Sequence, residues 1–327
     1  MALYQRGSIG PEVSKIQTRL RELGLYLGPI DGVFGGGTEV AVTAFQQANA
    51  LVVDGRVGPQ TWAALFAGAE IEKPLIANKP LEFRCMALTG AFETNRPFPD
   101  CFAGLSGDFD GQGISFGVLQ WNLGQGSLQP LLQEMDTNYP QVLQGIFDRD
   151  YPVLQAMLRA SREEQLAWAR SIQDLRRFVL LEPWQGQFKA LGRRQEFQDI
   201  QVKFGTALYE QALALCDTYG VSSGRAAALM FDIKVQNGSI SDLVRAQIER
   251  DFKQLDAPGD ADPGGLKEVA RLRIIANRRA EAANPRWVED VRTRKLTIAN
   301  GEGTVHGNYY NLEEQYGIAL SPTAVLA

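Results

Sequence analysis

Apolar residues recur at helical spacing in the first part of the chain. In GPEVSKIQTRLRELGLY, Val13, Ile16, Leu20 and Leu23 fall on one face of a helix, and Gly24 supplies a stop signal. TEVAVTAFQQANAL and TWAALFAG continue a mostly helical spacing. The pattern predicts three short helices within residues 1–68.

A short repeat lies among these helices. Residues 31–38, DGVFGGGT, and residues 54–61, DGRVGPQT, share the pattern Asp-Gly-x-x-Gly-x-x-Thr, and the second copy begins 23 residues after the first. Each copy supplies a turn and then a Thr that is able to cap a helix. The stretch AGAEIEKPLIANKP follows, and its prolines predict a linker at residues 69–80.

The pattern changes from Leu81 onward. LEFRCMALTGAFET predicts a helix that ends near Glu93, because the following TNRPFPD contains two prolines. DGQGISFGVLQWNLGQGS, at residues 110–127, is rich in glycine and polar residues, which predicts a turn or the wall of a cleft. REEQLAWARSIQDLRRFVL and EVARLRIIANRRAEAA return to helical spacing and are interpreted as scaffold helices.

Two later segments carry polar residues that are candidate substrate contacts. AALMFDIKVQNGSI predicts a helix whose Asp232, Gln236 and Asn237 either line a cleft and bind substrate or form an ordinary helix end capped by Asn-Gly. ANGEGTVHGNYYNLEEQYGI is glycine-rich and places His306 near two tyrosines, and aromatic rings beside polar groups suit sugar faces. A lone histidine is more often structural than catalytic, so His306 is a candidate substrate contact only.

Composition indicates a globular protein with an acidic balance. Hydrophobic residues make up 45% of the chain and charged residues 22%, and the net charge is −5, which argues against a general nucleic-acid binder. Residues 271–295 hold eight Arg or Lys against three acids, which indicates a solvated helix face or a contact with an anionic polymer. Cys85 and Cys101 either pair in an oxidising compartment or, like Cys216, are buried as small apolar groups.

The residue inventory excludes several kinds of catalysis. The chain has one histidine and no Cys-x-x-Cys, which argues against a zinc hydrolase, and it has no Gly-x-Ser-x-Gly, Walker or Rossmann motif. Hydrolysis of a glycosidic bond requires two carboxyl groups. Glu93 at a helix end is the candidate acid, and Asp110 is the candidate second carboxylate, with Asp108 as the second choice.

The repeat-containing segment resembles the peptidoglycan-binding domain of cell-wall hydrolases. The motifs that carry the resemblance are VSKIQTRLRELGLY, DGVFGGGTEVAVTAFQ and DGRVGPQTWAAL. The resemblance implies a groove for glycan and peptide near Asp31, Phe34, Thr38, Gly58 and Thr61. These positions are equally compatible with turn formation alone.

The segment around Glu93 resembles the lysozyme superfamily. ALTGAFET followed by DGQGISFGVLQWNLGQGS is similar to the helix and small hairpin that form the cleft in that superfamily, and residues 115–120 fit the Ser-x-Gly-x-x-Gln pattern of lytic transglycosylases and goose-type lysozymes. The order of acid and then DGQG is similar to chitosanases, which have Arg where this chain has Gln112. The resemblance implies substrate contacts by Ser115, Gln120 and Asn122.

Together these observations predict a mainly α-helical protein. We expect a small three-helix binding domain at 1–68, a linker at 69–80, and a lysozyme-like α-helical catalytic domain at 81–327 with a small β-hairpin at its cleft. The expected function is hydrolysis of the β-1,4 glycan linkage of peptidoglycan, as in a phage endolysin. The alternatives are a lytic transglycosylase, a chitosanase-type glycosidase and a non-catalytic wall-binding protein.

The expected setting follows from the same features. We expect peptidoglycan as the partner, a monomer, and no metal or organic cofactor. No apolar run approaches the roughly 18 residues that a membrane span needs, and no secretory signal is visible, so stable membrane insertion is not expected. The protein would be made in the cytoplasm and reach the cell wall through a pore or by another export route.

Overall fold

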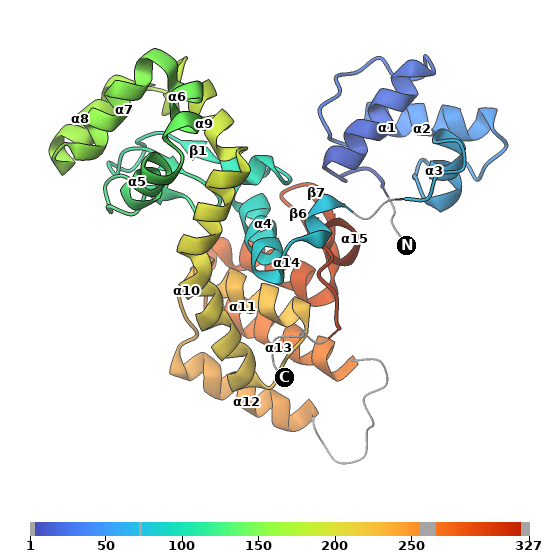
Figure 1. The fold of residues 1–327 in the computed structure, drawn as a ribbon. Helices are drawn as coiled ribbons and strands as arrows, with labels where there is room; N and C mark the ends of the chain where they lie inside the picture. Colours follow the sequence, from blue (N-terminus) through green and yellow to red (C-terminus); the bar gives the residue numbers. More distant parts are fainter. Residues whose placement is uncertain (1–3, 72–73, 256–265, 322–327) are drawn as a thin grey trace. The chain divides into compact units, whose positions relative to one another are not determined.

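The structure is mainly α-helical, as the sequence predicts. The computed structural model describes residues 4–71, 74–255 and 266–321 (Figure 1). The chain forms two compact units, one of Met1–Cys85 with Glu210–Ala327 and the other of Met86–Tyr209. This division places an additional boundary inside residues 81–327, which the sequence analysis treats as one domain.

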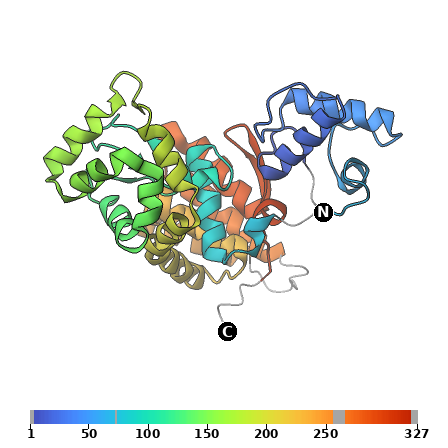
Figure 2. The same ribbon diagram turned by 45° about the horizontal axis from the view of Figure 1, so that its top comes forward.

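The N-terminal module contains the three predicted helices, α1 (Pro11–Glu22), α2 (Gly36–Ala48) and α3 (Pro59–Leu65). Figure 2 shows these blue helices gathered around one another. Most of the predicted apolar face of α1 is buried, because Val13, Ile16 and Leu20 have no exposed surface, whereas Leu23 follows the last residue of the helix and exposes 41% of its surface. They pack with residues of the other two helices and of the turns in a core that includes Phe34, Val42 and Trp62.

The 86–209 unit combines helices with two small antiparallel sheets. Helices α4 (Leu81–Thr94) and α10 (Gln195–Tyr219) each cross a unit boundary. The three-stranded sheet consists of β1 (Leu105–Ser106), β2 (Ser115–Phe116) and β3 (Trp121–Asn122) in that order. The other elements are η2 (Asp100–Ala103), α5 (Gln129–Asn138), α6 (Pro140–Phe147), η3 (Asp148–Asp150), α7 (Tyr151–Arg159), α8 (Arg162–Ser171), β4 (Gln173–Asp174), β5 (Val179–Leu180) and α9 (Trp184–Gly192).

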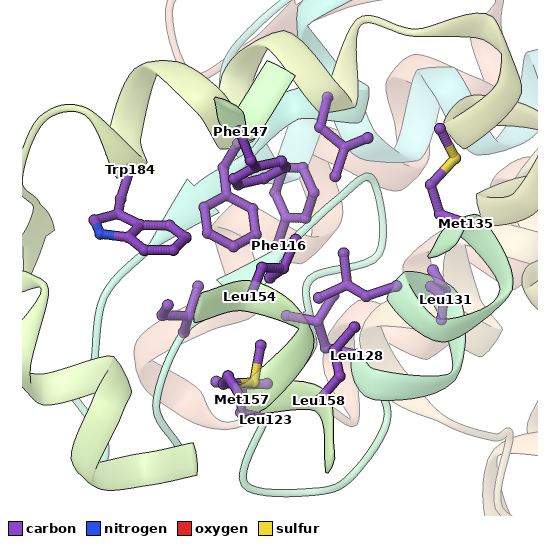
Figure 3. Packing of buried hydrophobic residues seen from close by; sticks show 14 of the residues in the cluster. Phe116, Leu123, Leu128, Leu131, Met135, Phe147, Leu154, Met157, Leu158 and Trp184 are labelled. Carbon is purple, nitrogen blue, oxygen red and sulfur yellow. The ribbon is translucent and has the colours of Figure 1, made fainter. Parts of the chain in front are cut away.

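An aromatic cluster forms the centre of this unit's core. Phe116 of β2 stacks on Phe197 at 5.4 Å between ring centroids and meets Phe188 edge-on at 5.1 Å. Phe147 contacts both Phe188 and Trp184, at 5.5 and 5.9 Å. Figure 3 shows Phe116, Phe147 and Trp184 in the same part of the core. Because β2 contributes Phe116 to this cluster, the small sheet is fixed to the helices around it.

The structure corrects the prediction of one scaffold helix over REEQLAWARSIQDLRRFVL. Helix α8 begins at a capping box, in which the Ser161 side chain accepts from the Glu164 backbone and the Glu164 side chain accepts from the Ser161 backbone. The helix ends at Ser171, and the chain then forms the β4–β5 hairpin. The carboxylate of Asp174 accepts backbone N–H groups from the two residues of the turn that follow Leu175, which competes with continuing the helix.

The C-terminal segment forms a group of helices and one hairpin. Its elements are α11 (Gly224–Asn237), α12 (Asp242–Leu255), α13 (Leu266–Glu281), η5 (Pro285–Trp287), α14 (Val288–Asn300), β6 (Glu302–Val305), β7 (Asn308–Asn311) and α15 (Leu312–Tyr316). A short helix, η1 (Leu75–Asn78), lies in the predicted linker. Helix α11 ends at Asn237, and the φ of 76° at its C-cap, Gly238, fits the predicted glycine stop.

Most of the charges of the basic segment at 271–295 have partners in the protein. Arg278 forms ion pairs with Asp251 and Glu281, and Arg292 pairs with Glu289. All three cysteines are free and buried, so the predicted option of a Cys85–Cys101 disulfide is wrong in this structure.

Within the described ranges, no helix is both long and apolar enough to cross a membrane.

Candidate active site

The last turn of α4 carries Glu93 and packs against the turn between β2 and β3. Gly90 lies against Val118, and a β-carbon at position 90 would collide with the Val118 side chain. Thr94, one turn further along, donates its hydroxyl to the Gly90 carbonyl at 2.7 Å and lies close to Gly104. Glu93 is exposed between these two contacts. The small residue at position 90 therefore sets how closely the end of α4 approaches the sheet.

The small sheet aligns Ser106 with two of the predicted polar residues, Ser115 and Asn122, in one row. Ser115 lies opposite Ser106 on one side and Asn122 on the other, and directly opposed residues share a face of the sheet. The Ser106 hydroxyl donates to Gln120 Oε1 at 3.2 Å. Ser115 and Asn122 therefore lie side by side, and Gln120 contacts the sheet through Ser106; their role as substrate contacts stays a prediction.

Two of these three residues have limited exposure. Ser115 and Asn122 expose 8% and 7% of their surface, whereas Gln120 is half-buried. Asn122 Oδ1 accepts from the Gln125 backbone at 2.8 Å, and its backbone atoms bond to Ser127, so Asn122 shapes the turn at 122–127. Of these three residues, Gln120 has the most surface available to a ligand.

A buried glutamine that the sequence analysis missed holds the turn in place. Gln201 of α10 is fully buried, accepts from the Val118 N–H at 2.8 Å and donates to the Phe102 carbonyl at 3.1 Å. A β-carbon at Gly117, which has a φ of 90°, would meet the Gln201 amide. The glycine of the Ser-x-Gly-x-x-Gln pattern is therefore required by both backbone conformation and space.

The two candidate aspartates have different environments. Asp108 is 8% exposed, and both of its carboxylate oxygens are engaged: Oδ1 accepts from the Gly113 N–H at 2.8 Å, and Oδ2 pairs with Arg170 Nε at 2.9 Å. Its backbone N–H donates to Gln173 Oε1 at 2.8 Å. Asp108 therefore ties the loop at 108–113 to α8 and the β4–β5 hairpin.

Asp110, by contrast, is exposed. Its Oδ1 accepts from the Gln112 N–H at 3.0 Å, which is a local turn contact. Its Oδ2 has no hydrogen-bond partner among the described residues. Of the two aspartates, Asp110 is the one whose carboxylate is available for chemistry.

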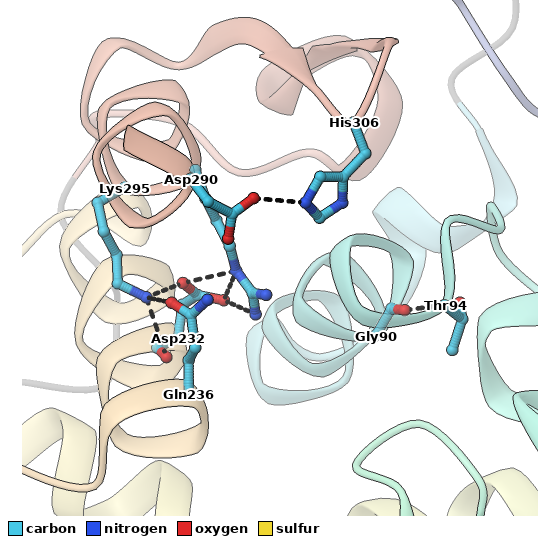
Figure 4. Close-up of polar contacts among 8 residues, drawn as sticks. Gly90, Thr94, Asp232, Gln236, Asp290, Lys295 and His306 are labelled. Carbon is cyan, nitrogen blue, oxygen red and sulfur yellow. Dashed lines mark hydrogen bonds and ion pairs between the residues drawn. The ribbon is translucent and has the colours of Figure 1, made fainter. Parts of the chain in front are cut away.

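Asp232 is buried in an ion network, which corrects the prediction that it lines a cleft. Asp232 and Lys295 have no exposed surface, and Arg294 exposes 2%. Figure 4 shows Asp232 and Lys295 facing each other in this network. Arg294 Nη2 and Nε donate to Asp232 Oδ1 at 2.6 and 2.9 Å, and Lys295 Nζ contacts Oδ2. Burial alone would raise the pKa of Asp232, but the two cations outweigh it and lower the pKa to about 2. Asp232 therefore organises α11 and α14 rather than contacting substrate directly.

The other two residues at the end of α11 are partly accessible. Gln236 Oε1 accepts from Lys295 Nζ at 2.7 Å, so it joins the same network. Asn237 is half-buried, and its Oδ1 is a buried atom with no hydrogen-bond partner among the described residues. Asn237 keeps hydrogen-bonding capacity that the protein itself does not use.

His306 lies at the tip of the β6–β7 hairpin. It has a φ of 50°, and Gly307 after it has a φ of 84°, which is the backbone of a tight two-residue hairpin turn. The His306 ring Nε2 lies 2.7 Å from Asp290 Oδ1 (Figure 4). His306 is exposed, and the pairing with Asp290 gives it a structural role at the start of α14.

The repeat in the N-terminal module is built around two buried glutamines. Gln17 Nε2 donates to Asp31 Oδ1 at 2.8 Å and to Thr38 Oγ1 at 3.2 Å, and its Oε1 accepts from the Gly32 N–H at 2.9 Å. Gln46 makes the same set of contacts with the second copy: its Nε2 donates to Asp54 Oδ1 at 2.9 Å and to Thr61 Oγ1 at 3.2 Å, and its Oε1 accepts from the Gly55 N–H at 2.9 Å. Gln17 precedes its aspartate by 14 residues and Gln46 by 8, so the repeat spacing does not reveal them.

These contacts correct the ligand roles expected for three residues of the module. Phe34, Thr38 and Thr61 expose 0%, 1% and 5% of their surface, so they build the core and close the turns. Asp31 is exposed and remains able to meet a ligand with its second oxygen. Gly58 precedes the first residue of α3 as its N-cap.

Among the described residues, no three His, Cys, Asp or Glu side chains lie together in a way that could hold a metal ion.

Solved structures similar in fold to this chain include chitosanases. The native chitosanase from Bacillus subtilis MY002 is 22% identical, with a TM-score of 0.41 over 68% of this chain and 87% of that chain. A GH46 chitosanase of Gynuella sunshinyii, in complex with chitotetraose, is 17% identical, with a TM-score of 0.40 over 68% of this chain and 86% of that chain.

Curated relatives match over short segments. A spore cortex-lytic enzyme of Bacillus cereus is 38% identical over 95 residues, or 29% of this chain and 36% of that protein. The spore cortex-lytic enzyme of Bacillus subtilis is 50% identical over 60 residues, or 18% of this chain and 20% of that protein. The N-acetylmuramoyl-L-alanine amidase CwlM of Mycobacterium tuberculosis is 40% identical over 57 residues, or 17% of this chain and 14% of that protein. The matches thus span about a third or less of these relatives.

The family match falls on the N-terminal module. Residues 9–65 match the family described as "Putative peptidoglycan binding domain". This range contains α1, α2 and α3 and both copies of the repeat. The chain therefore carries a domain of the peptidoglycan-binding kind at its N-terminal end.

Proposed function

We propose that this protein is a glycosidase that hydrolyses the β-1,4 glycan linkage of peptidoglycan. The observation that carries the proposal is the combination, in one chain, of a matched peptidoglycan-binding domain and an exposed glutamate at the end of a helix that packs against a small antiparallel sheet. Relatives named for cortex lysis and for muramoyl-alanine amidase activity support the cell wall as the site of action.

In this proposal, Glu93 is the general acid that protonates the leaving glycosidic oxygen, and Asp110 is the second carboxylate. The second carboxylate must be ionised and able to reach the anomeric centre or a water molecule. The exposure of Asp110 supports this role, and the two occupied oxygens of Asp108 argue against it for that residue. Gln120, a half-buried polar residue of the same unit, is the proposed substrate contact.

The test is mass spectrometry of soluble fragments released from purified peptidoglycan. The wild type is compared with Glu93→Gln and Asp110→Asn, and Asp108→Asn is the matched control in the same loop. We expect reducing muramic-acid ends from the wild type and from Asp108→Asn, and their loss in the other two variants. Anhydro ends would instead identify a lytic transglycosylase. Undiminished release by Glu93→Gln would contradict the assignment of the acid.

A further inference from the structure

The β4–β5 hairpin ends in an exposed cluster of basic and apolar side chains. Residues 175–179, which we call the hairpin tip, are all exposed, and their sequence is Leu-Arg-Arg-Phe-Val. Leu175 exposes 56% of its surface and Phe178 39%. The side chains of Arg176 and Arg177 form no ion pair or hydrogen bond with any described residue. Two arginines without partners beside an exposed ring form a surface suited to an anionic ligand.

The hairpin tip is tied to the loop that carries Asp110. The Gly107 N–H donates to the Phe178 carbonyl at 3.0 Å, and the Asp108 N–H donates to Gln173 Oε1 at 2.8 Å. A β-carbon at Gly107 would collide with both of these acceptor groups, so the two segments approach as closely as backbone allows. Asp110 follows Gly107 by three residues, which places its Cα within about 11 Å of that of Gly107. A polymer bound at Asp110 therefore passes close to the hairpin tip.

Phe178 occupies a backbone conformation that suits glycine better than phenylalanine. Its φ is 53°, in the left-handed region, which is uncommon for a bulky residue; such conformations occur at the ends of hairpin loops and also cluster at ligand clamps and active sites. The conformation is held by the Phe178 N–H, which donates to the Asp174 carbonyl at 2.7 Å. Because the ring is also exposed, core packing does not account for its presence here.

The charge of the tip narrows the choice of ligand. The whole chain carries a net charge of −5, so the tip is not part of a generally basic surface. Chitosan is a polycation and would be repelled by two arginines, whereas the stem peptides of peptidoglycan carry carboxylates. Arginine is the side chain best suited to carboxylates, because its planar guanidinium donates two parallel hydrogen bonds.

We propose that the hairpin tip binds the stem-peptide carboxylates beside the cleaved bond. Arg176 and Arg177 form the ion pairs, and the Phe178 ring packs against the adjoining sugar or peptide. The tip thereby selects peptide-bearing glycan over bare or cationic glycan. This inference rests on the proposed function, and it adds the residues that determine substrate choice.

The experiment uses two soluble substrates, glycan chains that carry stem peptides and the same chains after the peptides have been removed. The double variant Arg176→Gln/Arg177→Gln is compared with Arg159→Gln/Arg162→Gln, which removes two exposed charges near the far end of α8. We expect the first variant to raise KM for the peptide-bearing chains roughly tenfold, with kcat and the bare-chain KM unchanged. Added salt should raise this KM for the wild type more than for the variant. The control should match the wild type.

An equal loss on both substrates, or no change on the peptide-bearing chains, would overturn the proposal. Phe178→Gly separates contact from folding, because glycine accepts this φ: we expect an unchanged or higher Tm together with a raised KM. If Phe178→Gly keeps the KM of the wild type, the Phe178 ring does not contact the substrate. If the wild type cleaves neither substrate, the proposed function fails instead. In that case, calorimetric binding of peptide-bearing chains to Glu93→Gln, with and without the two arginines, still decides whether the tip binds them.

Discussion

Burial and hydrogen bonding separate two aspartates that the sequence presents as near equals. Asp108 and Asp110 both lie in GDFDGQG, and either fits the order of acid and then second carboxylate. In the structure, Asp108 accepts hydrogen bonds at both oxygens, whereas Asp110 uses one oxygen in a local turn. A carboxylate whose two oxygens hold a loop together is not free to act on a substrate, so the roles divide between structure and chemistry.

Asparagine substitutions should reveal this division. In Asp108→Asn, an amide N–H group faces either Arg170 or the Gly113 N–H, and an unsatisfied contact of this kind costs about 1–3 kcal/mol. We therefore expect the free energy of unfolding to fall by about that amount, with activity retained. Asp110→Asn should leave stability within about 0.5 kcal/mol of the wild type, as for other surface changes, and abolish activity. Urea denaturation and fragment release measure the two effects, and the reverse pattern would exchange the roles.

Asp232 offers a second prediction at the scale of one residue. Asp232→Asn leaves Arg294 and Lys295 buried without their counter-charge, and breaking a buried ion pair in this way costs about 3–5 kcal/mol. We expect a loss of that size at pH 7, measured by urea denaturation. Lys234→Gln, a change of a half-buried residue on the same helix, is the control and should stay close to the wild type.

Comparison of the wild type with Asp232→Asn at different pH values gives a further prediction. The pKa of Asp232 falls from 3.8 to about 2 in the folded protein. The ionised carboxylate therefore stabilises the folded protein above about pH 4, and this contribution disappears as the pH falls toward 2. The stability difference between wild type and Asp232→Asn should therefore narrow over that range. A difference that stays constant from pH 5 to pH 2 would show that the ionised carboxylate is not the stabilising group.

At the scale of elements, the contact between α4 and the β2–β3 turn positions Glu93. Gly90→Ala places a methyl group against Val118, and overpacking of this kind costs about 1–3 kcal/mol. We expect lower stability and lower activity, since the end of α4 must move away from the sheet. Val118→Ala should restore part of both in the double variant, because it removes the colliding methyl groups. Strictly additive effects in this double-mutant cycle would mean that the two residues do not contact.

The duplicated glutamine contacts of the N-terminal module give a prediction with an internal control. Gln17→Leu and Gln46→Leu each remove one buried amide, leave a backbone N–H without its partner and take away one of the two hydrogen bonds that the aspartate Oδ1 accepts, at a cost of about 1–3 kcal/mol. We expect similar losses from the two, measured by thermal unfolding of the full chain. Gln47→Leu, at the neighbouring exposed position, should have little effect.

The elements that periodicity predicts and those it misses differ in how they are stabilised. Helices α1 and α4 are predictable from local features of the sequence: α1 has one apolar face and a glycine stop, and α4 is a largely apolar run followed by two prolines. The β4–β5 hairpin is not, because QDLRRFVL continues the helical spacing of α8 while Asp174 forms the turn through its side chain. The burial of Asp232 is equally hidden, since its partners Arg294 and Lys295 lie more than sixty positions away in sequence.

At the scale of the whole molecule, the matched binding domain and the residues proposed for bond cleavage lie in different parts of the chain. The family match covers residues 9–65, and the candidate carboxylates Glu93 and Asp110 lie beyond it. The buried glutamine contacts of the module involve only residues of the module itself. Damage to one function should therefore leave the other measurable.

This separation predicts opposite outcomes for two variants on insoluble peptidoglycan. Glu93→Gln should sediment with the wall material with the same Kd as the wild type while releasing no fragments, because its change lies outside the module. Gln17→Leu/Gln46→Leu should bind the wall poorly yet cleave short soluble chains at the wild-type rate, because the 86–209 unit, which carries Glu93 and Asp110, holds its own core of buried residues. Loss of soluble-chain cleavage in the second variant would mean that the module contributes to catalysis, and loss of wall binding in Glu93→Gln would place the main binding surface at the candidate active site.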